Sequence, residues 1–386
     1  MRVTLKDIAR AAGVSIMTVS NVINGKHDRV SAETVERVRR IVAELGYVPN
    51  GSARSLAANS SRLIGLLVPA ASEVSLAISP HNIAIVGHIE RRLRKRGYHL
   101  LLRGVSDTAE IGEALRSWSL DGAVLLGFLD EEIGRLQRRV TGTTPVLAID
   151  SYSDNPLTTG VRTDDFTGAH LATTHLLSLG HRRIVFAAPS FTEVGVVHER
   201  FLGFHAELRD AGVSPQDCPT ETVDTKDDGI ELGRRLLASH PEATAVFATA
   251  DILAIGIIEG LHAIGVPVPE RVSVVGFDDL DISAYITPML TTVAQDIVGK
   301  ATHAVDRLLD LAEGGTTTPN HWSSTSDWSC ATPPHPRDQP PRAGEQADAP
   351  DPHVAHHHAV TAVLVEEGRT SAHHRRPVGS RTRTAR

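Results

Sequence analysis

The sequence predicts an α/β protein with an N-terminal three-helix helix-turn-helix head and a two-lobed core of parallel sheets flanked by helices. Three observations support this prediction. Residues 1–47 hold three short helical patterns separated by glycines. Residues 63–275 alternate short apolar runs with helical segments. The chain has 386 residues, more than one ordinary core buries, so we expect several packed units.

Charge is distributed unevenly along the chain. The formal net charge is −7, but residues 1–62 carry ten Lys and Arg against five Asp and Glu. The remainder holds 29 of the 39 basic residues and 41 of the 46 acidic ones. A small basic segment on a large acidic body suits a protein that meets phosphate groups with one end only.

Cysteine usage and hydropathy bear on the compartment. Two cysteines, Cys218 and Cys330, cannot form a disulfide framework and favour a reducing environment. The first residues lack the apolar run of a signal peptide, and no stretch has the length of a membrane span. We therefore expect a cytoplasmic protein.

Caps and glycines delimit the three helices of the head. Thr4 and Ser15 precede the first two helical patterns as N-caps, and Gly13 ends the first. Ser31 begins a third helix that ends at Gly46. Short helices with a tight glycine turn between the first two describe a helix-turn-helix, whose second helix enters the major groove of DNA.

The second helix of the head has a polar face opposite its apolar stripe. The amide of Asn21 can pair with adenine, whereas Ile16 and Met17 can only pack against thymine methyl groups or sugar edges. A merely solvated helix face is the alternative interpretation. The residues of the head expected to contact DNA are Thr4, Ser15, Ile16, Met17, Thr18, Ser20, Asn21 and Asn24.

A hinge helix is predicted over residues 48–60. Pro49 ends the head, and Asn50 can cap a short helix that runs to about residue 58. A helix this short that contains Gly51 is not stable alone in water, so we expect it to fold only against a partner. An ordinary linker helix is the alternative.

Two stretches carry a more specific pattern. They read VTLKDIARAAGVS at residues 3–15, continued by TVS at 18–20, and GYVPN at 46–50, leading to ARSL at 53–56. Both resemble the headpiece of the LacI family of repressors. The resemblance implies a homodimer that binds a near-palindromic DNA operator, with the hinge in the minor groove and Leu56 between base pairs. It adds to the expected DNA contacts Asn50, Ala53, Arg54 and Leu56.

The operator sequence does not transfer from relatives, because Asn21 stands where many of them carry Arg.

The core is predicted from continuous apolar strands, which are typical of parallel sheets covered on both faces. The predicted strands are residues 63–68, 98–102, 123–126, 146–149, 184–187, 245–248 and 272–275. The segments LGHRRI at 179–184, VSVVGFDD at 272–279 and LTTV at 290–293 resemble the LacI-family sensor, which has the periplasmic-binding-protein fold. The resemblance implies a core of residues 61–320. Its first lobe is about 61–160 plus 292–316, and its second lobe is about 161–291.

Polar residues near the carboxyl ends of the strands are the effector candidates, because ligands of open α/β lobes bind there. They are His81, Asn82, Asp150, Arg200, Asp251 and Asp278. The resemblance places Arg200 and Asp278 at ligand-binding positions, and such groups make directional bonds to hydroxyls. It implies a sugar or sugar derivative as effector. Asp251 can alternatively serve only as a helix cap.

Two departures from the family pattern fall in the predicted cleft. His81 and Asn82 stand where relatives often have two Phe residues, and Ala250 stands where Asn is usual.

Other functions find little support in the sequence. No dinucleotide or nucleoside-triphosphate loop, nucleophile elbow or metal-spaced His/Glu pair stands out, so we expect no enzyme, cofactor or metal site. The histidines at 356–358 and 373–374 lie in low-complexity sequence. Two alternatives remain open: a solute-binding sensor of the same fold, and an architectural DNA-binding protein without a ligand.

The predicted tail, residues 321–386, departs from both the periodicity and the resemblance. Residues 331–352 hold seven prolines and few apolar side chains, which is typical of disorder. Relatives close the second lobe with a strand that reads approximately Leu-Val-Val-Arg-x-Ser. One added base after the codon of His321 permits a reading His-Val-Val-Leu-Asp-Ile-Arg-Leu-Val-Val-Arg, so we hypothesise a frameshift that leaves the second lobe without this strand.

Overall fold

A computed structural model describes residues 3–26, 28–48, 60–70, 76 and 78–315, and the backbone of 322–324 and 327–329. The hinge predicted at residues 48–60 lies almost wholly outside the described residues. So do four expected DNA contacts, namely Asn50, Ala53, Arg54 and Leu56. Among the described residues, none of the helices combines the length and apolar character needed to span a bilayer.

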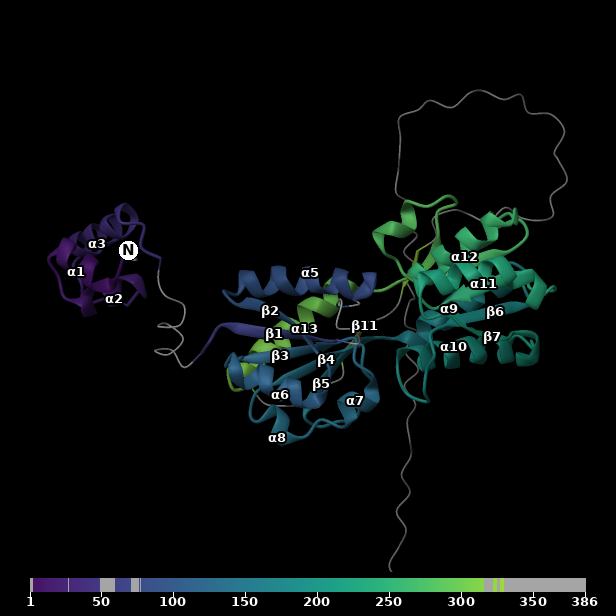
Figure 1. The fold of residues 1–386 in the computed structure, drawn as a ribbon, viewed down its shortest axis with the longest axis horizontal. Coiled ribbons are helices and arrows are strands. Elements are labelled where there is room, and N and C mark those ends of the chain that lie inside the picture. The colour runs from purple at the N-terminus through teal and green to yellow at the C-terminus, as the bar shows by residue number, and fades with distance from the viewer. Residues whose placement is uncertain are drawn as a thin grey trace, which may run out of the picture. The chain divides into compact units, whose positions relative to one another are not determined.

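Three short helices form the head, labelled α1 to α3 in Figure 1. Their bounds are Leu5–Ala12, Ile16–Ile23 and Ala32–Glu44. They enclose a small core in which Ile8, Val19 and Val38 are fully buried. This packing orients the second helix relative to the first, as the helix-turn-helix prediction requires.

The caps of the head are those predicted. The hydroxyl of Thr4 accepts from the backbone N–H of Asp7, whose carboxylate accepts in return from the N–H of Thr4 at 3.0 Å. The hydroxyl of Ser15 accepts from the N–H of Thr18 at 3.0 Å. Gly13 has φ +66°, the left-handed conformation that ends α1 without the strain a side chain adds.

The first lobe is a six-stranded parallel sheet in the order β11-β5-β4-β3-β1-β2. Its strands are β1 Leu63–Pro69, β2 His99–Val105, β3 Gly122–Leu126, β4 Val146–Ile149, β5 Thr158–Thr163 and β11 Trp322–Ser324. Its helices are α5 Pro80–Lys95, α6 Thr108–Ser117, α7 Asp130–Gly134, α8 Arg138–Thr141 and α13 Ile297–Ala312. Helices α5 and α13 pack together in one apolar cluster with the sheet, and α6 contributes to another.

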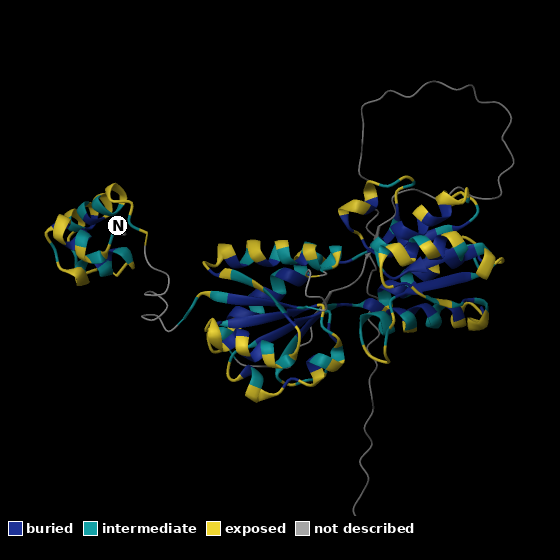
Figure 2. Ribbon diagram, viewed as in Figure 1, coloured by how far each residue is buried: buried dark blue, intermediate teal, exposed yellow. Residues whose placement is uncertain are grey.

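The second lobe is a six-stranded sheet in the order β12-β10-β9-β8-β6-β7, in which only the β10–β12 pair is antiparallel among the described strands. Its strands are β6 Ile184–Ala188, β7 Thr220–Thr222, β8 Ala245–Ala248, β9 Ser273–Asp278, β10 Thr291–Ala294 and β12 Asp327–Ser329. Its helices are α9 Asp165–Ser178, α10 Val196–Asp210, α11 Lys226–Ser239 and α12 Asp251–Ala263, with short 3₁₀ turns η1 Pro215–Asp217 and η2 Asp281–Ala284. Figure 2 shows the buried strands between helices whose outer faces are exposed.

Helices α11 and α12 pack unusually closely because glycines face each other across the contact. A Cβ added at Gly233 would collide with the backbone carbonyl of Ile257, and one at Gly260 with that of Ile230. A Cβ at Gly229 would lie 2.8 Å from the carbonyl oxygen of Leu253. The close spacing of α11 and α12 therefore depends on glycine, which has no side chain, at these positions.

Two features differ from the predicted boundaries. Strand β10 belongs to the second sheet, so the chain returns to the first lobe after Ala294 rather than at residue 292. The prediction of disorder from residue 321 onward is wrong for 322–324 and 327–329, which pair with β5 and β10. The expected lack of a closing strand in the second lobe is likewise not met, since β12 occupies that edge.

The physical reason for the missed strands is that a sheet edge offers unpaired backbone N–H and C=O groups. A short extended segment satisfies them whatever its side chains, so a sequence without apolar alternation can still close a sheet. Residues 330–386 lie outside the described residues, and the frameshift stays a hypothesis.

Candidate functional site

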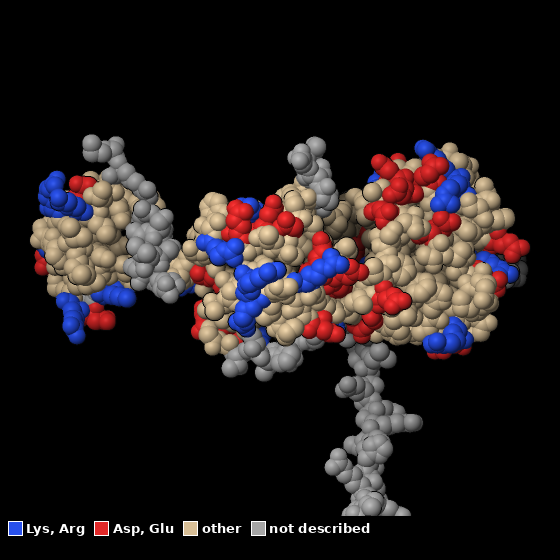
Figure 3. Space-filling model, turned by 60° about the horizontal axis from the view of Figure 1, so that its bottom comes forward, with Lys and Arg blue, Asp and Glu red and all other residues tan. Residues whose placement is uncertain are grey.

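The head exposes two apolar side chains at the start of α2. Ile16 is 49% exposed and Met17 is 69% exposed, although both are large and apolar. Beside them Ser20 and Asn21 are half-buried and Asn24 is exposed. Figure 3 shows Lys and Arg side chains at the edges of the head, around a surface of other residues. The start of α2 therefore exposes apolar side chains that the core of the head does not bury.

Five of the predicted DNA-contact residues also have structural partners within the head. Thr4 and Ser15 cap helices through their hydroxyls, and the hydroxyl of Thr18 lies 2.9 Å from that of Ser15. Ser20 accepts a hydrogen bond from the amide of Asn24 at 3.3 Å. The contacts between Ser15 and Thr18 fix the first turn of α2, where base edges are read in helix-turn-helix proteins.

In the core, two predicted carboxylates end strands in strained conformations. Asp150 follows β4 with φ +55°, and Asp278 ends β9 with φ +130°. Asp279 continues at φ +56°. Positive φ costs free energy for a residue with a side chain and is concentrated at functional sites. The strain therefore coincides with the predicted effector candidates.

Asp150 forms an ion pair with a buried lysine from α13. The ammonium of Lys300, which is 0% exposed, donates to Oδ1 of Asp150 at 2.5 Å and to Oε1 of Gln295 at 2.8 Å. Burial acts to raise the pKa of Asp150, but Lys300 and His81 outweigh it and hold that pKa below its usual range. Asp150 is therefore ionised at neutral pH.

His81 and Gln295 connect this ion pair to Asp278. Nε2 of His81 lies 3.1 Å from Oδ2 of Asp150, and its Nδ1 lies 3.4 Å from Oδ1 of Asp278. That Nδ1 is buried and makes no hydrogen bond to any described residue. The amide of Gln295 donates to Oδ1 of Asp278 at 2.6 Å. The chain thus brings both predicted carboxylates into one network.

Arg200 is held by a second buried carboxylate. Its Nε and Nη2 lie 2.9 and 2.7 Å from Oδ1 of Asp165, and Nη1 donates to the carbonyl of Thr249 at 2.5 Å. Its guanidinium lies over the ring of Phe277, 3.7 Å from the centroid. The hydroxyl of Tyr152 donates to the other oxygen of Asp165 at 3.0 Å. Arg200 is therefore fixed in one orientation beside the end of β9.

Asp251 has its carboxylate occupied by the protein itself. Oδ2 accepts from the N–H of Leu280 at 2.9 Å and from the hydroxyl of Ser283 at 2.7 Å, while Oδ1 accepts from Thr292 at 2.5 Å. Burial, with a contribution from Asp278, raises the pKa of Asp251 to about 7. This group joins the start of α12 to η2 and β10.

Asn82, the remaining effector candidate, lies near the start of α5. Its amide nitrogen is 3.0 Å from the position that a Cβ would take at Gly127, just beyond β3. Its half-buried amide makes no hydrogen bond to the described residues. It is thus at the carboxyl end of the first sheet, where the prediction placed it.

Lys300, Gln295 and Asp165 belong to this network but were not predicted from the sequence. Lys300 had a detectable signal, since it stands on the apolar stripe of α13 beside Ala301 and Ala304. A lysine on a core-facing stripe is rarely buried unless it is paired. Gln295 directly follows β10 and Asp165 lies two residues after β5, but neither strand was predicted, so no strand end marked these two residues.

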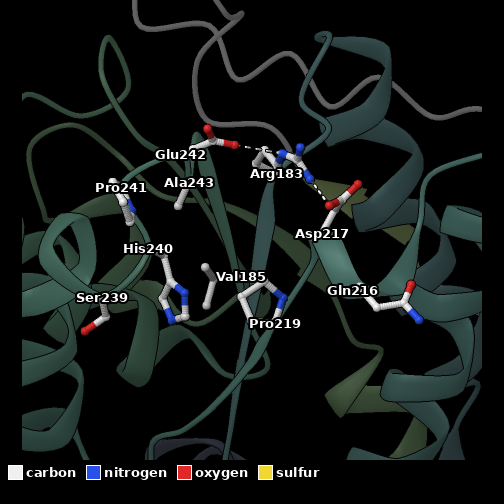
Figure 4. Close-up of a pocket in the computed structure, with 10 residues that line it drawn as sticks. All are labelled: Arg183, Val185, Gln216, Asp217, Pro219, Ser239, His240, Pro241, Glu242 and Ala243. Atoms are coloured by element: carbon white, nitrogen blue, oxygen red, sulfur yellow. Dashed lines mark ion pairs between the residues drawn. The ribbon is translucent and has the colours of Figure 1, made fainter.

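A hollow in the second lobe lies apart from these residues. It has a volume of about 370 Å³ and is lined by the ten residues labelled in Figure 4. Its Arg183 forms ion pairs with Asp217 and Glu242. None of the effector candidates lines this hollow. Within the described part of the chain there is no group of three His, Cys, Asp or Glu side chains placed to hold a metal.

Comparisons with known proteins match both parts of the chain. Residues 4–50 match the family of bacterial regulatory proteins, lacI family, and residues 173–326 match a periplasmic binding protein-like domain. The HTH-type transcriptional repressor PurR of Pasteurella multocida is 31% identical over 315 residues, which are 80% of this chain and 91% of that protein.

Two solved structures are similar over most of the chain. The lac repressor dimer bound to operator and the anti-inducer ONPF has a TM-score of 0.74 at 29% identity, covering 85% of this chain and 98% of that one. The complex of the transcriptional regulator CelR with cellobiose has a TM-score of 0.63 at 29% identity, covering 85% and 99%.

Proposed function

The chain belongs to the lacI family of bacterial regulatory proteins, and from that premise we propose that it represses transcription under the control of a small effector. The head binds an operator, and a sugar or sugar derivative bound in the core sets the affinity. We further propose that it acts as a cytoplasmic homodimer on a near-palindromic site. The similar lac repressor is a dimer bound to operator, and the similar CelR is a complex with cellobiose.

The observation that carries the proposal is the network around Asp278. This carboxylate ends β9 in a strained conformation and is held by Gln295, with His81 beside it. Groups fixed in advance lose little entropy when they bind a ligand. A fixed carboxylate, a fixed guanidinium at Arg200 and the amide of Asn82 are suited to the hydroxyls of a carbohydrate.

The proposed contact residues fall into two sets. Those for the operator in the described head are Thr4, Ser15, Ile16, Met17, Thr18, Ser20, Asn21 and Asn24. Those for the effector are His81, Asn82, Asp150, Arg200 and Asp278. Asp251 supports the site by holding η2 and β10, because three protein donors already occupy its carboxylate.

The test uses the purified full chain and a random duplex library, from which bound sequences are selected. The selected duplex is then titrated with protein, with and without a panel of sugars. We expect a sugar to change the apparent Kd in the wild type but not in Asp278→Asn. Asp281→Asn, an exposed aspartate in η2, is the matched control and should behave as wild type. Failure to enrich any sequence would contradict operator binding.

A further inference from the structure

Lys300 is a cation placed on an apolar surface. Helix α13 directs Ala301, Ala304 and Leu308 into the core of the first lobe, and Lys300 shares that buried face with 0% exposure. Burying an ammonium is costly unless a counter-charge and hydrogen bonds compensate for the lost water. The groups that contact the ammonium of Lys300 must therefore compensate for its burial.

Those partners are the groups of the proposed effector site. The ammonium is 2.5 Å from Oδ1 of Asp150 and 2.8 Å from Oε1 of Gln295. The same Oε1 accepts from the hydroxyl of Thr163 at 2.8 Å, and this fixes the side chain so that its amide points to Asp278. Lys300 thus neutralises one effector carboxylate and orients the residue that holds the other.

The cluster as a whole carries more carboxylates than cations. Four buried or nearly buried aspartates, Asp150, Asp165, Asp251 and Asp278, accompany two cations, Arg200 and Lys300. Arg200 pairs with Asp165 and Lys300 pairs with Asp150, while His81 lies between Asp150 and Asp278. The pKa of Asp251 is raised to about 7 by burial, so this group is only partly ionised near neutral pH and the excess negative charge belongs mainly to Asp278. An anionic ligand would meet this excess of negative charge, whereas neutral hydroxyls can donate to the carboxylates.

We infer that Lys300 is a specificity-determining residue that sets the charge class of the effector. By cancelling the charge of Asp150 it permits an uncharged polyhydroxy ligand to bind, while the cluster rejects sugar acids and sugar phosphates. This inference rests on the proposed function, since it concerns the ligand of the same site.

The first arm of the test is a thermal-shift panel on the wild-type chain. The probes are neutral sugars (ribose, glucose, cellobiose), the anions gluconate, glucuronate and glucose 6-phosphate, and the amine glucosamine. We expect the largest upward shift in Tm from a neutral sugar, with affinities for the matched anions at least about tenfold weaker. A sugar acid or phosphate as the strongest stabiliser would overturn the inference while leaving control by a sugar derivative standing. No stabiliser in any class would overturn the proposed sugar effector and this inference with it.

The second arm changes the charge. In Lys300→Met, Asp150 loses its ammonium partner and keeps only His81 beside it, so the affinity for the neutral sugar should fall at least about tenfold and the preference should move toward its amine analogue. The double variant Lys300→Met with Asp150→Asn removes both charges, so it should regain the Tm lost by the single variant and keep the preference for neutral over anionic ligands. Lys95→Met, at an exposed lysine of α5, is the control.

The double variant also covers the case in which Lys300→Met alone does not fold. One outcome would show that Lys300 is only structural, and the inference would then fail. In that outcome the folded variants rank neutral, anionic and amine ligands by affinity as the wild type does, and Lys300→Met binds the neutral sugar as tightly as the wild type. An anion preference in the double variant would contradict the inference as well.

Discussion

The ammonium of Lys300 and the carboxylate of Asp150 form a buried ion pair, 2.5 Å between Nζ and Oδ1, that joins α13 to the carboxyl end of β4. The two residues are 150 positions apart in the chain. Their contact ties the returning helix of the first lobe to the edge of the sheet where the effector candidates gather. The stability of this lobe should therefore respond to the protonation of Asp150.

Acid should destabilise the wild type through this pair. The pKa of Asp150 is depressed in the folded state, so its stabilising contribution is present above the unfolded value near 3.8 and is lost as pH falls through the folded value. When the pH falls from about 5 to about 2, we expect the free energy of unfolding to decrease by about 1.5–3 kcal/mol more in the wild type than in the Lys300→Met, Asp150→Asn double variant. Urea unfolding at several pH values measures this, and parallel pH profiles would refute it.

Asp251 should produce the opposite pH dependence. Its carboxyl binds a proton more tightly in the folded state, with a pKa raised to about 7, so stability falls as pH rises from about 4 to about 7. The loss is at most about 4 kcal/mol, the free-energy equivalent of the shift. Asp251→Asn does not titrate, and its amide keeps an oxygen that accepts from the N–H of Leu280 and a nitrogen that can bond to the hydroxyl of Thr292. Its Tm should therefore change less between pH 5 and 8 than the Tm of the wild type. An equal slope in both proteins would count against the account.

The sequence predicted the structure best where the residues of a single helix or strand determine its conformation. The caps at Thr4 and Ser15 and the seven apolar strands were predicted correctly, because capping and continuous burial act over a few neighbouring residues. Strands β5, β7 and β10 were missed because TTGVRT, TET and TTVA are short segments that contain polar residues, and β11 and β12 were missed because they form at sheet edges.

The site was predicted in part for the same reason. Asp150 and Asp278 could be identified as strand ends, but their link through His81 and Gln295 depends on residues far apart in the chain. The role of Asp251 depends on three donors that come from β10, η2 and the loop before η2. No local pattern encodes such contacts.

The close packing of α11 on α12 predicts a strong effect of a small substitution. Gly233→Ala places a methyl group against the carbonyl of Ile257 and should cost about 1–3 kcal/mol. Gly87→Ala is the matched control, since Gly87 lies within α5 with nothing within 4 Å of its would-be Cβ. That change should be neutral or stabilise by up to about 1 kcal/mol. Equal effects on urea unfolding would refute the packing argument.

Two substitutions in the head should affect DNA affinity and folding stability separately. Met17→Ala removes a side chain that is 69% exposed, so the Tm should stay unchanged while affinity for the selected duplex falls about tenfold. Ser15→Ala removes an N-cap and should destabilise the head by about 1 kcal/mol. Circular dichroism and fluorescence anisotropy on the same preparations compare the two. Undiminished duplex affinity in Met17→Ala would remove that residue from the proposed contact surface.

The coupling between core and head is tested most directly by one affinity. The Kd of the wild-type chain for its selected duplex is measured by fluorescence anisotropy at about 0.15 M salt, with and without a saturating amount of the most stabilising neutral sugar. We predict a change of at least about tenfold, corresponding to about 1.4 kcal/mol of coupling, which disappears in Asp278→Asn. A Kd that stays the same in the presence of a sugar that demonstrably binds would contradict the account.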